Sequence, residues 1–177
     1  MIPAAAREVC GAVFFDRDGV INVDHGYVHR RDQFDWIPGV AAAIRRVKTS
    51  GRRAFLITNQ AGVARGYYGE DAIGTLHAWV QQTLAEQGAA FDDIRYCPHH
   101  PEGTVAAYAR ACDCRKPKPG MLLDLMAHWP TDLARSGVIG DKLSDLEAGA
   151  AAGIKGRLFE GGDLDAAVAG LLAEIGG

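Results

Sequence analysis

The chain has 177 residues, a length typical of one domain, and 48% of them are hydrophobic while 23% are charged. The formal net charge is −3, which gives no general electrostatic attraction to nucleic acids or membranes. No apolar run approaches the roughly 18 residues of a membrane-spanning helix, and Arg7 and Glu8 interrupt the start where a signal peptide needs an apolar stretch. We therefore expect one domain over residues 1–177, monomeric and cytoplasmic, with no nucleic-acid or membrane partner.

Short apolar runs rich in β-branched and aromatic residues predict buried strands. In chain order these runs are Ala12–Phe15, Ala54–Thr58, Ile94–Tyr96, Gly137–Ile139 and Gly156–Phe159. Hydrophobic residues at helical spacing predict helices between and after them, through Val40, Ala43, Ile44 and Val47; Ile73, Leu76, Val80 and Leu84; Leu122, Leu125, Met126 and Trp129; and Leu164, Val168, Leu171, Leu172 and Ile175. This alternation predicts an α/β fold, a Rossmann-like parallel sheet with helices on both faces. Segments 22–36 and 97–117 fit neither pattern, and loops of that length are often functional.

Polar side chains follow the predicted strands at their carboxyl ends. They are Asp16 and Asp18 after the first strand, Thr58, Asn59 and Gln60 at the second, and Asp141 after the fourth. Ligands of open α/β sheets bind beyond the carboxyl ends of the strands, so we expect these side chains to converge. A single aspartate is more simply explained as a turn or capping residue. Three at converging strand ends favour a Mg²⁺ site, because Mg²⁺ prefers oxygen ligands.

These motifs resemble those of the haloacid-dehalogenase-type phosphatases. The resemblance rests on DRDG after the first strand, a Thr at the second, an Arg-Lys pair before a helix, and GDKLSD after the fourth strand. More narrowly, FFDRDGVINVDHGYV, TNQAGVARG, CPHHPEG, CDCRKPKPGM and GDKLSD resemble the heptose 1,7-bisphosphate 7-phosphatases, a family related to the histidinol phosphatases. The resemblance covers nearly the whole chain and implies a phosphatase of this fold.

The resemblance also implies a covalent mechanism. Asp16 is then the nucleophile that forms an aspartyl-phosphate, and Asp18 is the general acid and base. Mg²⁺ is held by Asp16, the main-chain carbonyl of Asp18 and Asp141, which reduces repulsion between the nucleophile and an anionic substrate. Thr58 and Lys116 stabilise the transferring phosphoryl group.

Further positions of the resemblance concern the substrate. They are Asp24, His25, Gly26, Tyr27, Asn59, Gln60, Arg115 and Lys142. Arg115 matches a substrate-recognition position, and its planar fork suits a second phosphate or a pair of hydroxyls. The implied reaction removes the 7-phosphate of D-glycero-D-manno-heptose 1,7-bisphosphate, a small sugar phosphate used for ADP- or GDP-heptose and the lipopolysaccharide core. Taken singly, His25, Tyr27 and Arg115 are as well explained by ordinary surface or packing roles.

Three of the four cysteines lie in the predicted loop 97–117 together with histidine. Cys97, His99, Cys112 and Cys114 supply three thiolates and an imidazole, the ligand set of a closed tetrahedral zinc site. Their one-residue spacings are shorter than in most zinc motifs, so the residues alone leave free or redox-active thiols open. The resemblance favours Zn²⁺. Four protein ligands leave no position for water, so the zinc is expected to be structural.

The spacing of the motifs indicates whether a cap domain could cover the predicted site. The stretches from Asp18 to Thr58 and from Thr58 to Lys116 are filled by predicted elements, so no separate cap domain fits. Two alternative functions remain. One is a phosphatase for histidinol phosphate or another small phosphomonoester. The other is a non-enzymatic binding module in which Asp16 accepts phosphate, but an acid/base group at Asp18 serves turnover and argues against it.

Overall fold

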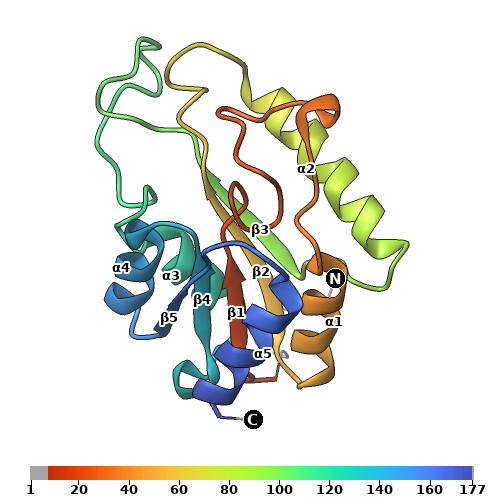
Figure 1. Cartoon of the computed structure of the whole chain (residues 1–177). Helices are drawn as coiled ribbons and strands as arrows, with labels where there is room; N and C mark the ends of the chain where they lie inside the picture. The colour runs from red at the N-terminus through yellow and green to blue at the C-terminus, as the bar shows by residue number, and fades with distance from the viewer. Residues whose placement is uncertain (1–7, 177) are drawn as a thin grey trace.

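A five-stranded parallel sheet forms the centre of the computed structural model, which describes residues 8–176 (Figure 1). The strands are β1 (Ala12–Phe15), β2 (Arg53–Asn59), β3 (Asp93–Cys97), β4 (Gly137–Gly140) and β5 (Lys155–Leu158). Their order across the sheet is β3-β2-β1-β4-β5, and every pairing between neighbours is parallel. The predicted α/β fold with a Rossmann-like parallel sheet is confirmed. The predicted bounds of β1 are the same, and those of the other strands differ by at most one residue at either end.

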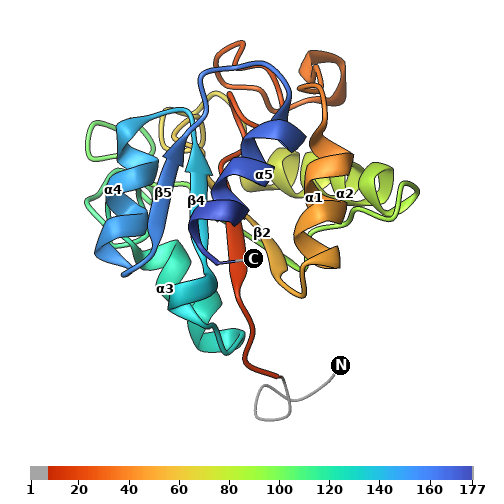
Figure 2. The same ribbon diagram turned by 60° about the horizontal axis from the view of Figure 1, so that its bottom comes forward.

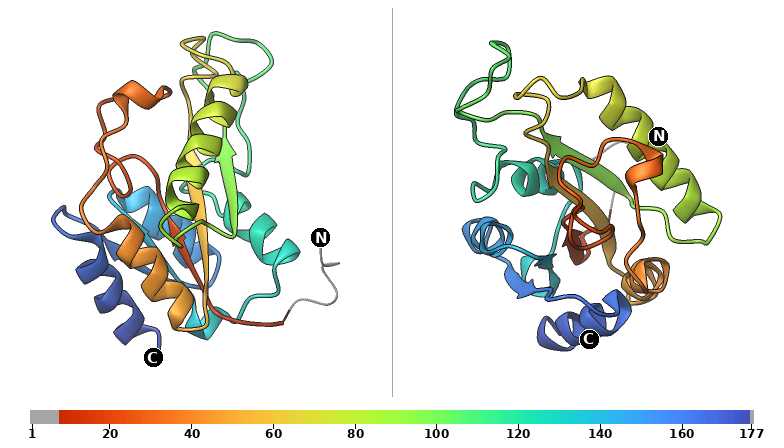
Figure 3. Two further views of the ribbon diagram at one scale, coloured as in Figure 1. Left: turned by 90° about the vertical axis from the view of Figure 1, so that its right-hand side faces the viewer. Right: turned by 45° about the horizontal axis from the view of Figure 1, so that its top comes forward.

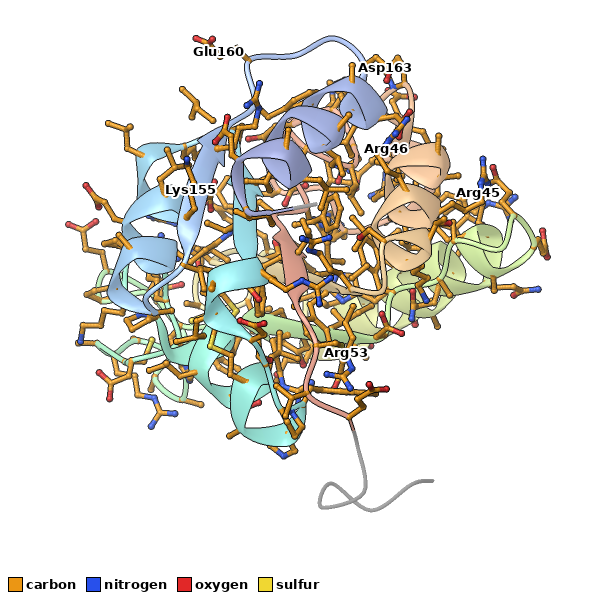
Figure 4. The ribbon with its side chains drawn as sticks, turned by 90° about the horizontal axis from the view of Figure 1, so that it is seen from below. Arg45, Arg46, Arg53, Lys155, Glu160 and Asp163 are labelled. Atoms are coloured by element: carbon orange, nitrogen blue, oxygen red, sulfur yellow. The ribbon has the colours of Figure 1, made fainter. Side chains whose placement is uncertain are left out.

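Five helices cover the sheet within the described residues. They are α1 (Val40–Thr49), α2 (Glu70–Ala85), α3 (Gly120–His128), α4 (Leu143–Ala151) and α5 (Leu164–Glu174), with short 3₁₀ turns at Arg31–Gln33 and Leu133–Arg135. One hydrophobic cluster joins α1, α2 and α5 to one face of the sheet, and a second joins α3 and α4 to the other face. Helices α1 and α5 lie side by side (Figure 2). At the end of the molecule seen in Figure 4, Arg46 on α1 forms an ion pair with Asp165 on α5 at 2.7 Å.

Strand β1 is buried on both faces and fixes the position of the residues that follow it. Val13 and Phe15 belong to the cluster with α1 and α5, whereas Ala12 and Phe14 belong to the cluster with α3. The alternation of side chains along a strand places them this way, and the central strand of a parallel sheet is apolar on both sides for the same reason. The backbone that leads into Asp16 is therefore held by packing on both faces.

Helix α4 is the element for which the sequence shows no hydrophobic stripe. Its buried residues are Asp145, Ala148 and Gly149. A Cβ atom on Gly149 would lie 2.3 Å from Cγ1 of Val138, so only glycine lets the helix pack this closely on β4. A helix that packs through small residues has no broad apolar face for a pattern search to detect.

Three loops stand at the carboxyl end of the strands (Figure 3). They are residues 22–36, 60–69 and 98–119, and within residues 8–176 the ribbon shows no further domain covering that end. The absence of a cap, expected from the spacing of the motifs, agrees with this architecture. Residues 8–176 include no helix with the length and apolar character that crossing a membrane requires.

Candidate active site

A cavity of about 510 Å³ opens at the carboxyl end of the sheet. It brings together most of the residues predicted from the sequence: Asp16, Asp18, Asp24, Gly26, Tyr27, Thr58, Asn59, Gln60, Arg115, Lys116 and Lys142. His25 and Asp141 are not among its lining residues. The Nε2 atom of His25 lies 2.6 Å from Oδ2 of Asp35 at the protein surface, so the imidazole pairs with a loop carboxylate.

Asp16 and Lys116 form a buried ion pair on the floor of the cavity. The Lys116 ammonium donates to Oδ1 of Asp16 at 2.7 Å and to the carbonyl of Ile57 at 3.2 Å, and it lies 2.6 Å from Oδ1 of Asp145. Burial disfavours the charged ammonium, but the carboxylates of Asp16 and Asp145 outweigh it and raise the pKa of Lys116. The site thus keeps a permanent cation beside the predicted nucleophile.

Three carboxylates gather next to this cation. Oxygen atoms of Asp16, Asp141 and Asp145 all lie within 4.8 Å of one another. Burial and the neighbouring Asp16 raise the pKa of Asp141 to about 7, and its buried Oδ1 has no hydrogen-bond partner. The backbone at Gly19, with φ +88°, lies against the Asp141 carboxylate. A Cβ atom at this position would lie 2.2 Å from Oδ2 of Asp141, so only glycine allows this close approach. Crowded carboxylate oxygens with one left unpartnered fit a Mg²⁺ ion.

The Asp18 carboxylate is held by donors from two sides. Nη2 of Arg17 donates to both of its oxygens at 3.0 Å, Nδ2 of Asn22 donates to Oδ1 at 3.0 Å, and Nε2 of Gln60 donates to Oδ2 at 3.0 Å. Asp18 lines the cavity beside Asp16, which lies two positions earlier in the chain. A carboxylate with so many fixed donors has one orientation relative to the cavity.

The end of β2 supplies a hydroxyl and two amides. Thr58 is buried and its Oγ1 accepts from Nε2 of Gln60 at 2.8 Å. The amide of Asn59 accepts from the backbone N–H of Lys116 and donates to its carbonyl, both at 3.1 Å. Asn59 therefore holds the backbone that presents Lys116, as well as lining the cavity.

The outer rim of the cavity is polar and aromatic. Lys142 reaches Oδ2 of Asp24 at 3.3 Å, and the Tyr27 ring meets the Tyr67 ring edge-on at 4.8 Å. Tyr27 has φ +52°, a left-handed conformation that is uncommon for a side chain of this size. Arg115 stands at the rim next to the cysteine-rich loop, where Nη1 donates to the carbonyl of His99 at 3.5 Å.

The cysteine-rich loop brings its four predicted ligands into one cluster. The Sγ atom of Cys97 lies 3.5 Å from that of Cys112 and 2.9 Å from that of Cys114, and Nδ1 of His99 lies 3.4 Å from Sγ of Cys114. The close contact with Cys97 lowers the pKa of Cys114 to about 5, and the same contact raises the pKa of Cys97. Ligands about 2.3 Å from a tetrahedral zinc are separated by about 3.8 Å, so the cluster is close to the dimensions of a zinc site. No disulfide joins the cysteines of the described residues.

Several residues of the site are absent from the sequence-based set. Ala61, Tyr68, Pro117, Ser144 and Asp145 also line the cavity. The spacing in GDKLSD, with an aspartate one helical turn after Asp141, was the available signal for Asp145. Tyr68 donates to Oε1 of Gln60 at 2.9 Å, and burial raises its pKa to about 12, so the hydroxyl keeps its proton. No sequence pattern pointed to that contact.

Comparison with known proteins places this geometry in a family. The HAD-hydrolase-like family model matches residues 113–172. The D-glycero-beta-D-manno-heptose-1,7-bisphosphate 7-phosphatase of Rhodopseudomonas palustris is 54% identical over 164 residues, which cover 93% of this chain and 91% of that protein. The chain belongs to this family of HAD-like phosphatases. The expected family and the expected phosphatase activity are thereby confirmed, and the non-enzymatic binding module is excluded.

Solved structures of family relatives agree. A HAD-like phosphatase from Mesorhizobium loti has 34% sequence identity and a TM-score of 0.85, covering 94% of this chain and 86% of that one. The D,D-heptose 1,7-bisphosphate phosphatase of B. bronchiseptica, solved with magnesium and phosphate, has 34% identity and a TM-score of 0.79, covering 93% and 99%. The family fold thus extends over nearly all of the chain.

Proposed function

We propose that this phosphatase hydrolyses the 7-phosphate of D-glycero-β-D-manno-heptose 1,7-bisphosphate. The observation that carries the proposal is the 54% identity to a relative of that name, which extends over 93% of the chain and so includes every residue of the cavity. The product keeps its 1-phosphate and is available for nucleotidyl transfer toward ADP- or GDP-heptose. We further propose that residues 1–177 form one phosphatase domain, which works in the cytoplasm as a monomer.

In the proposed mechanism, Asp16 attacks the phosphorus and forms an aspartyl-phosphate. Asp18 gives a proton to the leaving sugar oxygen and then removes one from the attacking water. The Lys116 ammonium and the Thr58 hydroxyl stabilise the phosphoryl oxygens, which carry the charge of the transition state. Asp145 holds Lys116 in place through their 2.6 Å contact.

We propose that Asp16, Asp141 and the main-chain carbonyl of Asp18 hold Mg²⁺. When bound, Mg²⁺ neutralises part of the charge on the nucleophile and on the phosphate. Support comes from the unpartnered Oδ1 of Asp141 and from the three clustered carboxylates. The relative from B. bronchiseptica was solved with magnesium and phosphate.

Residues at the outer rim of the cavity bind the sugar and the phosphate that does not react. We assign contacts with the sugar to Asp24, Gly26 and Tyr27, and contact with the phosphate that does not react to Arg115, whose fork suits bidentate binding. A Zn²⁺ ion held by the cysteine cluster gives Arg115 a rigid base, because Arg115 directly follows the ligand Cys114. Remote binding of this kind raises turnover as well as affinity when it positions the reacting group.

The experiment compares kcat/KM for heptose 1,7-bisphosphate, fructose 1,6-bisphosphate and histidinol phosphate, with Mg²⁺, for the wild type and Arg115→Ala. Lys118→Ala is the matched control, because Lys118 is an exposed cation three positions away that pairs with Asp113. The wild type should prefer the heptose, and Arg115→Ala should lower kcat/KM for the bisphosphates far more than for histidinol phosphate. A wild-type preference for histidinol phosphate refutes the proposed substrate, and an equal loss on all three refutes the role of Arg115.

A further inference from the structure

Arg17 stands between the two predicted catalytic aspartates in the chain and is fully buried. Its side chain is the largest one wholly excluded from solvent among the described residues, at 0% exposure. A buried guanidinium is costly unless its N–H groups all find partners. The family resemblance gives this buried charge no role, although it lies at the carboxyl end of β1, beside the predicted catalytic residues.

The guanidinium joins three segments that are distant in sequence. Nη2 donates to both oxygens of Asp18 at 3.0 Å and to the carbonyl of Val28 in the loop 22–36. Nε donates to Oδ1 of Asp18 at 3.3 Å. Nη1 lies 3.3 Å from Nε2 of His77 on α2, sixty residues further along the chain. Asp18 is thus tied through one side chain to a loop and to a helix.

His77 completes this arrangement as an acceptor. A guanidinium has only donors, so Nε2 of His77 accepts, and its ring proton is on Nδ1. His77 is 6% exposed and lies on the buried face of α2 with Leu76 and Val80. Burial, together with the nearby Arg17, lowers the pKa of His77 to about 3, so the ring stays neutral and keeps its lone pair for Arg17. A neutral imidazole accepts a hydrogen bond from the guanidinium of Arg17 and carries no charge of its own, so it leaves the ion pair between Arg17 and Asp18 intact.

We propose that Arg17 and His77 are positioning residues for the reaction. His77 fixes Arg17, and Arg17 fixes the Asp18 side chain, which in its protonated form gives a proton to the leaving group. The proposal rests on the proposed function, because it takes Asp18 as the general acid. Gln60 and Asn22 contact the same carboxylate, so a misplaced Arg17 leaves Asp18 in the site but less firmly oriented. Small misplacements of a reacting group are enough to cost large factors in rate.

This role has a signature that a purely structural role lacks. A misplaced general acid slows the loss of a poor leaving group, such as a sugar alkoxide, more than the loss of p-nitrophenolate, which departs without a proton. The value of kcat/KM reports the steps up to the first irreversible one, here formation of the aspartyl-phosphate. The comparison of heptose 1,7-bisphosphate with p-nitrophenyl phosphate therefore isolates the acid step.

The test uses His77→Leu, which removes the acceptor, and His77→Gln, whose amide oxygen can replace it. Arg17→Lys keeps the charge and loses the fork. We expect His77→Leu and Arg17→Lys to lower kcat/KM for the heptose bisphosphate about tenfold or more. In the same two variants, kcat/KM for p-nitrophenyl phosphate should fall by less than about threefold. His77→Gln should retain most of the wild-type kcat/KM for the heptose bisphosphate. Val80→Ala is the matched control, because it removes buried volume one turn along α2 without touching a polar group.

Equal losses on both substrates, or none, in His77→Leu and Arg17→Lys would overturn the proposal, as would a leaving-group dependence of the same size in Val80→Ala. If His77→Leu does not fold, Arg17→Lys and His77→Gln carry the comparison. A wild type that hydrolyses p-nitrophenyl phosphate but not the heptose bisphosphate refutes the proposed substrate alone. The positioning claim is then decided with phenyl phosphate, whose leaving group is poorer than p-nitrophenolate.

Discussion

Two buried charges define the chemistry at the scale of single residues. The carboxylate of Asp16 faces the cavity with the Lys116 ammonium 2.7 Å away, and Asp145 holds that ammonium from the other side at 2.6 Å. A fixed cation at this position costs no reorganisation when the charge of the phosphoryl group develops. The same arrangement makes the site sensitive to loss of either partner.

Replacement of the aspartates separates their roles. Asp16→Asn should abolish phosphate release, because an amide cannot form the covalent intermediate. Asp18→Asn should lower kcat by a factor of roughly 10² to 10⁴, the usual contribution of general acid–base catalysis. The control is Asp32→Asn, since the Asp32 side chain is 71% exposed and pairs with Arg30 at the surface. Substantial turnover by Asp16→Asn, measured as released phosphate, contradicts the covalent mechanism.

Removal of the buried cation should affect stability as well as rate. Lys116→Met leaves Asp16 and Asp145 facing each other without a counter-charge, and breaking a buried ion pair in this way costs about 3 kcal/mol. We expect urea unfolding without Mg²⁺ to show that loss and phosphate release to be negligible. Because Mg²⁺ binds the same carboxylates, its addition should restore part of the stability. A variant as stable as the wild type without Mg²⁺ contradicts the assigned ion pair.

The buried His77 predicts how stability depends on pH. Its pKa is about 3 in the folded protein and 6.5 in the unfolded chain. Above pH 6.5 the imidazole is therefore neutral in both states, and its protonation does not reduce the free energy of unfolding. Below that, the unfolded state binds a proton that the folded state refuses, and stability is lost as the pH falls toward 3. At pH 5 the loss is about 2 kcal/mol. Urea unfolding at pH 7.5 and pH 5 should show this loss in the wild type and not in His77→Gln; equal losses in both would contradict it.

At the scale of elements, the regular parts of the fold were predictable and the polar network was not. Phe14, Phe55 and Val138 lie in short apolar runs that mark central strands, and the strand ends then located the site residues near Asp16. Helix α4 was not predicted, because it packs on the sheet through the small residues Ala148 and Gly149 and has no hydrophobic stripe. Charged residues such as Arg17 are normally exposed, and its burial depends on His77, a contact between distant segments that no local pattern encodes.

We propose that the order of the cysteine-rich loop, residues 97–117, depends on a zinc ion held by its four clustered side chains. Cys112→Ser should lower both the zinc content, from about one per chain, and the melting temperature, because metal binding and ordering of such a loop are coupled. Cys10→Ser is the control, since Cys10 lies outside the cluster at Cys97, His99 and Cys114. Elemental analysis and thermal unfolding provide the measurements. Wild-type protein purified without chelator that contains no zinc would contradict the assignment.

At the scale of the whole molecule, the sheet supplies a rigid floor and the loops supply selectivity. The strand ends fix Asp16, Thr58 and Asp141, while the rim residues Tyr27 and Arg115 come from two of the three loops above them. We expect the substrate itself to complete the enclosure of its reacting phosphate, because residues 8–176 place no cap domain over this edge. Such a design favours a substrate long enough to reach the rim while its terminal phosphate lies on the floor.

The proposed hydrolysis of the 7-phosphate is tested most directly by identifying which of the two phosphates is released. The wild-type protein is incubated with Mg²⁺ and D-glycero-β-D-manno-heptose 1,7-bisphosphate, and the reaction is followed by ³¹P NMR. We predict that the signal of the primary 7-phosphate disappears while the anomeric 1-phosphate signal persists, with one equivalent of inorganic phosphate released. Loss of the 1-phosphate, or persistence of both signals under conditions in which histidinol phosphate is hydrolysed, would contradict it.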